Sequence, residues 1–244
     1  MLQLHNVHRS VGKTNIINGI DLSIQSGQAI GLVWPNGCGK SSLINLINGF
    51  NRLSKWTIIF NEKDISSLSV EDRANSGIGR VFQSAGIFKQ LTLFENLSLA
   101  YVQKLSWKQK LLPLKFLPQN IKDEIDAVLK ELDLYEKKNE LAWNLSWWQM
   151  RLLEIGRLYL QNTQLYLLDE PTAWVSPKLK DTVVNLINKI IKTGKTVIIV
   201  EHDFSFLASF VDTFYVMNEW KILLHGDHQM IKESPEVKQL YFGH

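Results

Sequence analysis

The stretch WPNGCGKSS at residues 34–42 follows an apolar run, QAIGLVW at 28–34, and leads directly into KSSLINLINGF at 40–50. The apolar run predicts a buried strand, and the recurring Leu and Ile residues after it predict a helix. A loop that ends in Gly-Lys-Ser between a strand and a helix is typical of a phosphate-binding loop. The first glycine of that pattern is replaced here by Trp34.

This loop contains the groups that nucleotide phosphates and Mg²⁺ require. Backbone N–H groups from Gly37 to Ser42, at the start of a helix, are expected to hold the β- and γ-phosphates. Lys40 is expected to neutralise phosphate charge, and the Ser41 hydroxyl to contact Mg²⁺. A glycine-rich turn with a surface lysine is the alternative. The predicted nucleotide contacts in the loop are Trp34, Pro35, Asn36, Gly37, Cys38, Gly39, Lys40, Ser41 and Ser42.

A second motif, which contains two adjacent acidic residues, is LYLLDEPTA at residues 165–173. Its apolar residues predict a buried strand that ends at Asp169. We expect the Asp169 carboxylate to ligate the metal and the Glu170 carboxylate to orient the attacking water. A solvated pair of acids at a strand end is the alternative, and the phosphate loop argues against it.

Two further polar residues end strand-like runs. Gln83 ends RVFQ at 80–83, and His202 ends TVIIVEH at 196–202. Gln83 is a candidate ligand of Mg²⁺ or of the water, and His202 a candidate partner of the γ-phosphate. Taken singly, each has the alternative of being a hydrogen-bonded structural residue, and only the whole set favours a catalytic role.

Strands alternate with helical patterns along most of the chain, which predicts an α/β fold with a mostly parallel sheet. Two β-rich runs at the start, QLHNVHRSV and NIINGIDLSI, predict an N-terminal antiparallel part. Ser69 with Asp72, and Thr92 with Glu95, have the spacing of capped helix starts. The expected organisation is one domain over residues 1–244, with an inserted helical subdomain at 84–160 and a helical tail at 228–244.

Composition limits the function. The chain has 244 residues, 45% of them apolar, with a net charge of +3. Its lysines are scattered, so we expect no nucleic-acid partner. No apolar run approaches the roughly 20 residues of a membrane span, and Cys38 is the single cysteine, which together favour a cytoplasmic protein.

These motifs together resemble the ATP-binding subunit of ABC transporters over essentially the whole chain. In that family the stretch at 145–149 is Leu-Ser-Gly-Gly-Gln at a helix N-terminus, and it closes over the γ-phosphate held by a second subunit. The resemblance implies a P-loop NTPase fold of ABC type, ATP and Mg²⁺ as cofactors, and ATP hydrolysis. It also implies nucleotide contacts from the residue that replaces an adenine-stacking aromatic and from the signature stretch, namely Val11, Ser146, Trp147, Trp148 and Gln149.

The resemblance also implies partners and a location. They are a second ATPase subunit, identical or different, and transmembrane permease subunits, with the protein bound peripherally at the inner face of the cell membrane. GIGRVFQ (77–83), EHD (201–203) and SPEVKQLYFG (234–243) resemble the ATPases of branched-chain amino acid and urea importers. Lipopolysaccharide-export ATPases, a non-transport ABC ATPase and a catalytically silent binding subunit remain the alternatives.

Tryptophan departs from the family in a systematic way. Glycine is used at the phosphate loop and the signature because the backbone must approach phosphate without a Cβ in the way. Only Trp107 among the eight tryptophans lacks a family glycine position. The other seven are Trp34, Trp56, Trp143, Trp147, Trp148, Trp174 and Trp220.

Three explanations fit this placement: a UGA codon that means glycine and has been read as tryptophan, a degenerate subunit without catalysis, or deliberate replacement of glycine. We favour the first, because some bacterial lineages use UGA for glycine. Were the tryptophans genuine, hydrolysis would fall to background or below. Turns that need positive φ would also lose on the order of 1 kcal/mol or more each.

Overall fold

The computed structural model describes residues 1–11, 14–33, 40–51, 57–82, 86–104, 117–172, 177–201 and 203–242. The chain divides into two compact units. The first unit comprises Met1–Arg80, Gln164–Glu170 and Ile191–His244, and the second comprises Val81–Thr163 and Pro171–Ile190.

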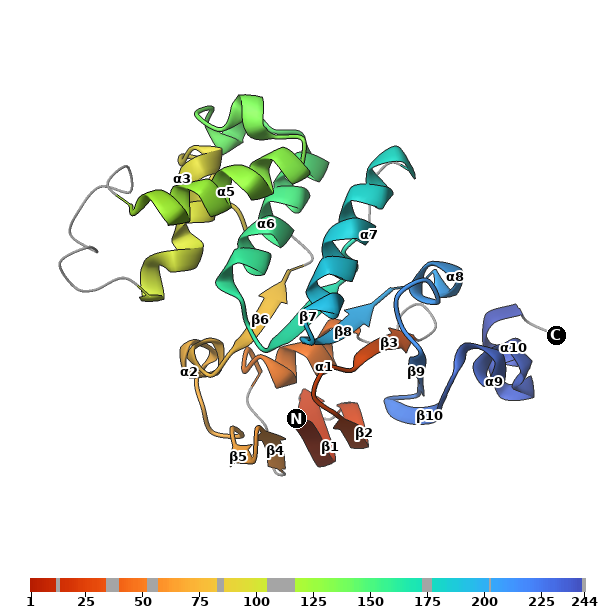
Figure 1. Ribbon diagram of the computed structural model, residues 1–244. Coiled ribbons are helices and arrows are strands. Elements are labelled where there is room, and N and C mark those ends of the chain that lie inside the picture. The colour runs from red at the N-terminus through yellow and green to blue at the C-terminus, as the bar shows by residue number, and fades with distance from the viewer. Residues whose placement is uncertain are drawn as a thin grey trace. The chain divides into compact units, whose positions relative to one another are not determined.

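An antiparallel sheet forms the N-terminal part of the first unit, as the two β-rich runs predicted (Figure 1). Alternate residues of its first strand, Leu2 and Leu4, are buried, so one face of the sheet covers the core. The strand order is β2-β1-β4-β5. The strands are β1 (Leu2–Val11), β2 (Thr14–Ile24), β4 (Thr57–Phe60) and β5 (Lys63–Asp64).

The larger sheet is mostly parallel, which confirms the predicted fold class. β3 pairs in parallel with β8 and with β9, and β7 pairs in parallel with β8. At one edge, β10 joins the sheet in the antiparallel sense, beside β9. The order is β10-β9-β3-β8-β7-β6. The strands are β3 (Ala29–Val33), β6 (Ile78–Val81), β7 (Leu165–Asp169), β8 (Thr196–Val200), β9 (Thr213–Asn218) and β10 (Lys221–Gly226).

Short helices complete the first unit. The side chain of Ser69 accepts a hydrogen bond from the Asp72 N–H, so the predicted cap of α2 is confirmed. Leu43, Ile44 and Ile47 of α1 are buried in the core that the two sheets share. The helices are α1 (Lys40–Ile47), α2 (Val70–Asn75), α8 (Phe204–Leu207), α9 (His228–Glu233) and α10 (Pro235–Phe242).

The second unit is helical in its described residues (Figure 1). Thr92 and Glu95 form the predicted capping box at the start of α3. Along α5 and its C-cap, Ile121 is half-buried, and the apolar residues that follow it on the same face are buried, namely Ile125, Val128, Leu129 and Leu132. The helices are α3 (Leu93–Ser98), η1 (Leu99–Lys104), α5 (Gln119–Glu131), η3 (Tyr135–Lys137), η4 (Ala142–Asn144), α6 (Trp147–Gln161) and α7 (Pro177–Lys192).

No helix within the described ranges combines the length and the apolarity that crossing a bilayer requires.

Candidate functional site

Several predicted site residues lie outside the described part of the chain, namely residues 34–39, Gln83 and His202. Lys40 and Ser41 begin α1, and Val11 ends β1, but only their backbone is described. Ser42 lies in the first turn of α1 and is half-buried. The order of elements, a buried strand β3 followed after residue 39 by helix α1, is the one that the phosphate loop predicted.

Asp169 is the last residue of β7 and is buried. The Arg80 guanidinium donates to its carboxylate over 3.1 Å, and the side chains of Arg80 and Asp169 are only 7% and 2% exposed. Arg80 also donates to the side-chain oxygen of Asn45, on α1, at 2.5 Å. Through Arg80, the acidic end of β7 is therefore connected to the helix that follows the predicted phosphate loop.

Glu170 follows Asp169 with a left-handed backbone, at φ +48°. Its N–H donates to the Val200 carbonyl at the end of β8, over 2.9 Å. A non-glycine residue in this region is strained by about 1–3 kcal/mol, and such strain concentrates at functional sites. The chain turns sharply at Glu170, so this residue does not continue the direction of β7. The carboxylates of Asp169 and Glu170 therefore have different surroundings, although the two residues are adjacent in the sequence.

A magnesium ion fits the chemistry of this strand end. Mg²⁺ prefers hard oxygen ligands and is commonly held by one or two carboxylates together with substrate phosphates. No group of three or more His, Cys, Asp or Glu side chains suited to a metal occurs in the described residues. Asp169 provides one carboxylate of this kind at the end of β7.

The signature stretch begins α6 in the second unit. Ser146 is the N-cap, and its hydroxyl accepts from the Gln149 N–H at 3.4 Å. The Gln149 side chain accepts in turn from the Ser146 N–H at 3.0 Å, which completes a capping box. Trp147 and Trp148 are the first two helical residues, and Trp147 is 40% exposed. The tryptophan rings therefore lie at the helix N-terminus that the resemblance assigns to a phosphate.

The tryptophans at family glycine positions differ in backbone conformation. Trp220, in the turn between β9 and β10, has φ +68°, so the family glycine predicted there would meet a real conformational need. Trp143, Trp147 and Trp148 are not among the residues with positive φ. Backbone conformation therefore does not require glycine at these three positions. Space for a ligand is the remaining reason for glycine at the signature.

Three charged side chains of α6 hold the chain on both sides of residues 83–85. Arg151 donates to the Phe82 carbonyl and pairs with Glu154 over 3.1 Å. Glu154 accepts from the N–H groups of Phe82, at 3.3 Å, and Gly86, at 3.1 Å. Arg157 donates to the Gly86 carbonyl at 2.6 Å. We call Arg151, Glu154 and Arg157 the α6 clamp.

Burial sets the electrostatics of the α6 clamp. Arg151 and Glu154 are 0% and 2% exposed. Burial raises the pKa of the Glu154 carboxyl, while the Arg151 charge and the two backbone N–H groups oppose that rise. Burial also lowers the pKa of Arg157. Because the buried charges are paired and hydrogen-bonded, loss of one partner should be strongly destabilising.

An exposed apolar surface lies in the same unit. Phe88, Leu141 and Trp143 are 58%, 47% and 67% exposed. Two backbone hydrogen bonds, from Trp143 to Lys89 and from Ala142 to Leu91, join the two segments that carry these side chains. We call Phe88, Leu141 and Trp143 the apolar surface of the second unit. Large exposed apolar side chains that gather in this way mark interaction sites.

Residues 17–173 match the protein-family model described as ABC transporter. This match covers more than half of the chain, from β2 to the segment after the Asp169–Glu170 pair. The chain belongs to the ABC transporter family. The resemblance drawn from the motifs is thereby confirmed.

Relatives of this ABC transporter family member match over its whole length. It is 30% identical to the high-affinity branched-chain amino acid transport ATP-binding protein BraF of Pseudomonas aeruginosa, covering 100% of this chain and 98% of that protein. It is 28% identical to the lipopolysaccharide export system ATP-binding protein LptB of Haemophilus influenzae, with coverages of 100% and 97%. The fold matches the crystal structure of the ADP conformation of an ATP-binding cassette of an ABC transporter, with a TM-score of 0.84, 28% identity and coverages of 100% and 99%.

Sequence reasoning missed the roles of Arg80 and of the α6 clamp in this ABC transporter family member. Arg80 stands in GIGRVFQ, a stretch that resembles importer ATPases. Arg151, Glu154 and Arg157 are spaced three residues apart on a helix, so they share a face, and this spacing was an available signal. Their backbone partners at 82 and 86 could not be read from any spacing.

Proposed function

We propose that this protein binds ATP with Mg²⁺ and hydrolyses it as the energy-supplying subunit of an ABC transporter. One observation carries the proposal: Asp169 and Glu170 lie at the carboxyl end of β7, in the parallel sheet whose strand β3 leads into residues 34–42. Carboxyl ends of parallel strands share one edge, and nucleotides bind there in such sheets. In this proposal the acids at the end of β7 therefore lie beside the phosphate-binding loop.

The proposed roles follow from the chemistry of each side chain. Lys40 neutralises the β- and γ-phosphates, while Ser41 and Asp169 hold Mg²⁺, which offsets the charge that develops on the phosphates. Glu170 accepts a hydrogen bond from the attacking water and orients it towards the γ-phosphate. His202 hydrogen-bonds that phosphate, and Gln83 contacts the metal or the water.

A second subunit completes the proposed site. Ser146 is exposed at the N-terminus of α6, where the helix dipole favours an anion. Each subunit would present this terminus to the ATP held by its partner, so that two copies enclose two nucleotides. Indole rings at 147 and 148 would obstruct that approach. The active form in this proposal therefore has glycine at both positions.

The apolar surface of the second unit is the proposed contact with a membrane-embedded permease. Phe88 lies two residues after Gly86, which the α6 clamp holds through Glu154 and Arg157. A permease that presses on Phe88 would thus act on a segment fixed to the helix that begins at Ser146. In this proposal the protein lies peripherally on the inner face of the cell membrane.

The proposed solute is a branched-chain amino acid or a related small molecule taken up by the cell. BraF supports this choice through its printed function and its match along the whole chain, and GIGRVFQ at 77–83 supports it through the motif. LptB is a full-length relative of nearly equal identity, so lipopolysaccharide export is the second candidate. Reconstitution with the permease encoded beside the gene, followed by uptake of labelled leucine, distinguishes the two.

The decisive experiment measures ATP hydrolysis by the chain with glycine at 34, 147, 148 and 174. We expect Glu170→Gln to lower kcat by roughly 100-fold or more, the usual contribution of a general base, while ATP binding persists. Glu71→Gln, an exposed acid on α2, is the matched control and should leave kcat unchanged. Failure of the glycine-restored chain to bind ATP, or full activity of Glu170→Gln, would contradict the proposal.

A further inference from the structure

An apolar cavity of about 390 Å³ lies in the first unit, and neither Asp169 nor Glu170 is among its lining residues. It is enclosed by α8, α9 and α10 together with residues of β3 and β9. Its apolar lining includes Val33, Ala208, Val216, Ile231 and Val237. Three polar residues, Ser205, His228 and Lys232, complete the lining. We call it the C-terminal cavity.

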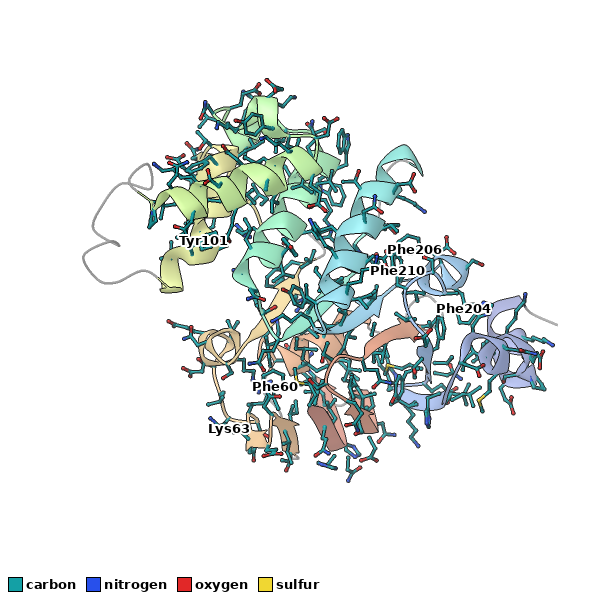
Figure 2. All side chains as sticks on the ribbon, viewed as in Figure 1. Phe60, Lys63, Tyr101, Phe204, Phe206 and Phe210 are labelled. Carbon is teal, nitrogen blue, oxygen red and sulfur yellow. The ribbon has the colours of Figure 1, made fainter. Side chains whose placement is uncertain are left out.

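Aromatic contacts hold one wall of this cavity in place. The Phe204 ring stacks on the His228 ring, with centroids 4.9 Å apart and an interplanar angle of 18°. Phe204 also contacts Phe214 of β9, at 4.6 Å between centroids. Figure 2 labels Phe204 together with Phe206 and Phe210 around α8. Because Phe204 is packed on two rings, it is restrained from moving into the space that it lines.

A positively charged side chain, that of Lys232, lies at the opening of the cavity. Lys232 is one helical turn after His228 on α9, so both side chains lie on the face that lines the cavity. Ser205 and Lys232 are exposed, which places the opening to solvent beside them. Lys232 forms no ion pair with any residue in the described part of the chain.

Nearby acids make other hydrogen bonds. Asp227 caps α9 by accepting from the Met230 N–H at 2.8 Å. Glu233 accepts from the side-chain amide of Gln229 at 3.0 Å, and Glu236 accepts from the Ser234 hydroxyl at 2.6 Å. The positive charge of Lys232 is therefore available to an anion at the opening.

From these features we infer that the C-terminal cavity binds a small amphiphile that has an apolar body and a carboxylate head. The apolar walls take the hydrocarbon part, and Lys232 pairs with the carboxylate at the solvent edge. Cavities that bind small molecules measure roughly 300–1,000 Å³ and combine apolar walls with a few polar groups, and this cavity has both properties. Octanoate is a suitable probe of this class.

The test is a titration of the full chain with octanoate, in the absence of nucleotide, by isothermal titration calorimetry. We expect saturable binding at one site. Ala208→Phe should fill the cavity and abolish the binding signal. Lys232→Gln should weaken octanoate binding by roughly three- to fivefold, as removal of one solvent-exposed ion pair does. Lys238→Gln, an exposed lysine of α10 outside the lining, is the matched control.

Comparison with octanol tests the role of the carboxylate separately from that of the apolar walls, because octanol has the same number of carbon atoms as octanoate but no charge. Wild-type protein should bind octanoate more tightly than octanol, and Lys232→Gln should bind the two alike. Absence of saturable octanoate binding would overturn the site, as would unchanged binding in a folded Ala208→Phe variant. If that variant does not fold, an octanoate preference that survives Lys232→Gln overturns the assignment. None of these measurements depends on ATP hydrolysis.

Discussion

Arg80 and Asp169 form a buried ion pair at the end of β7, with 3.1 Å between the guanidinium nitrogen and the carboxylate oxygen. The two residues are 89 positions apart in the sequence, and Arg80 also donates to Asn45 of α1. The pair therefore fixes the proposed metal ligand relative to the helix that follows the phosphate loop. The Arg80 guanidinium therefore neighbours the carboxylate that we propose as a metal ligand.

Arg80→Gln should lower the free energy of unfolding by about 3 kcal/mol, because it removes the guanidinium that pairs with the buried Asp169 carboxylate. Asp169→Asn should be destabilising for the reciprocal reason. The double variant should lose clearly less than the two single losses added together, since neither charge is then left alone. Urea denaturation of the four proteins measures this coupling. Additive losses would show that the pair does not act as a unit.

Glu154→Ala should destabilise the protein by about 3 kcal/mol and reduce ATP turnover. It removes the acceptor of two backbone N–H groups and the carboxylate that pairs with the buried Arg151 guanidinium. We expect kcat to fall more than ATP affinity, because the clamp acts on the chain around Gln83 and not on the phosphate loop. Steady-state kinetics on the glycine-restored chain provide both parameters.

Glu154→Gln and Glu140→Ala are the controls for this experiment. The Glu154→Gln variant keeps one side-chain oxygen as an acceptor for the N–H groups, so much of the turnover should return. Glu140 is exposed in the same unit, and its removal should change little. Equal effects of Glu154→Ala and Glu140→Ala would refute a positioning role for the α6 clamp.

Tyr101 makes stability depend on pH in the alkaline range. Burial, followed by its 2.5 Å hydrogen bond to Glu124, raises the pKa of the Tyr101 hydroxyl well above its usual range. The unfolded chain ionises this tyrosine near pH 10 and the folded chain does so only at higher pH. The Tyr101 contribution is therefore fully present below about pH 10 and is lost as pH rises beyond it.

Tyr101→Phe should remove this alkaline dependence, at a loss of about 1 kcal/mol at neutral pH from the missing hydrogen bond. Urea unfolding between pH 8 and pH 11 measures the slope of stability against pH. Glu124→Gln keeps a hydrogen-bond acceptor but removes the charge, so its slope should lie between the other two. A Tyr101→Phe slope equal to that of the wild type would rule out this origin.

Trp220→Gly should stabilise the protein by about 1 kcal/mol, because glycine adopts the +68° φ of this turn without strain. Trp143→Gly is the matched comparison. Trp143 is 67% exposed on η4 and does not have positive φ, so glycine there should bring no such gain. Thermal unfolding of both variants makes the comparison, and equal shifts in Tm would contradict it.

The gene itself tests the interpretation of the tryptophans. UGA codons at 34, 147, 148 and 174, with glycine found by mass spectrometry of the natural protein, are the expected result. UGG at all four positions would reject misreading of the code. Natural protein that carries these tryptophans and still hydrolyses ATP at a transporter-like rate would contradict the proposed obstruction of the site.

Continuous apolar runs made the buried strands predictable. LYLLD and TVIIV predicted strands that match β7 and β8 in both bounds, because strands covered on both faces lack polar alternation. Caps at Ser69 and Thr92 were equally readable from local spacing. β9 and β10 were missed, although they form a hairpin. Its turn has Glu219 and Trp220 at positive φ, and a tryptophan conceals the glycine signal of such turns.

The acids of the candidate site were predictable because each is adjacent in sequence to a strand end. Their surroundings were not. The Arg80–Asp169 pair and the contacts of Glu154 with Phe82 and Gly86 join segments about 70 to 90 positions apart, at |i−j| of 89, 72 and 68. Periodicity reports which face of one element is buried, but it does not report which distant backbone group meets a given side chain.

At residue 170, which has a left-handed backbone conformation, stability of the fold and the proposed chemistry favour different side chains. Glycine would adopt φ +48° without strain, so the residue that imposes the least backbone strain at this position has no carboxylate. Selection for thermal stability alone would therefore favour loss of the carboxylate at residue 170, and with it loss of the proposed ATP hydrolysis. A variant library screened only for heat resistance should therefore be checked for loss of acid at residue 170 before its members are taken as improved enzymes.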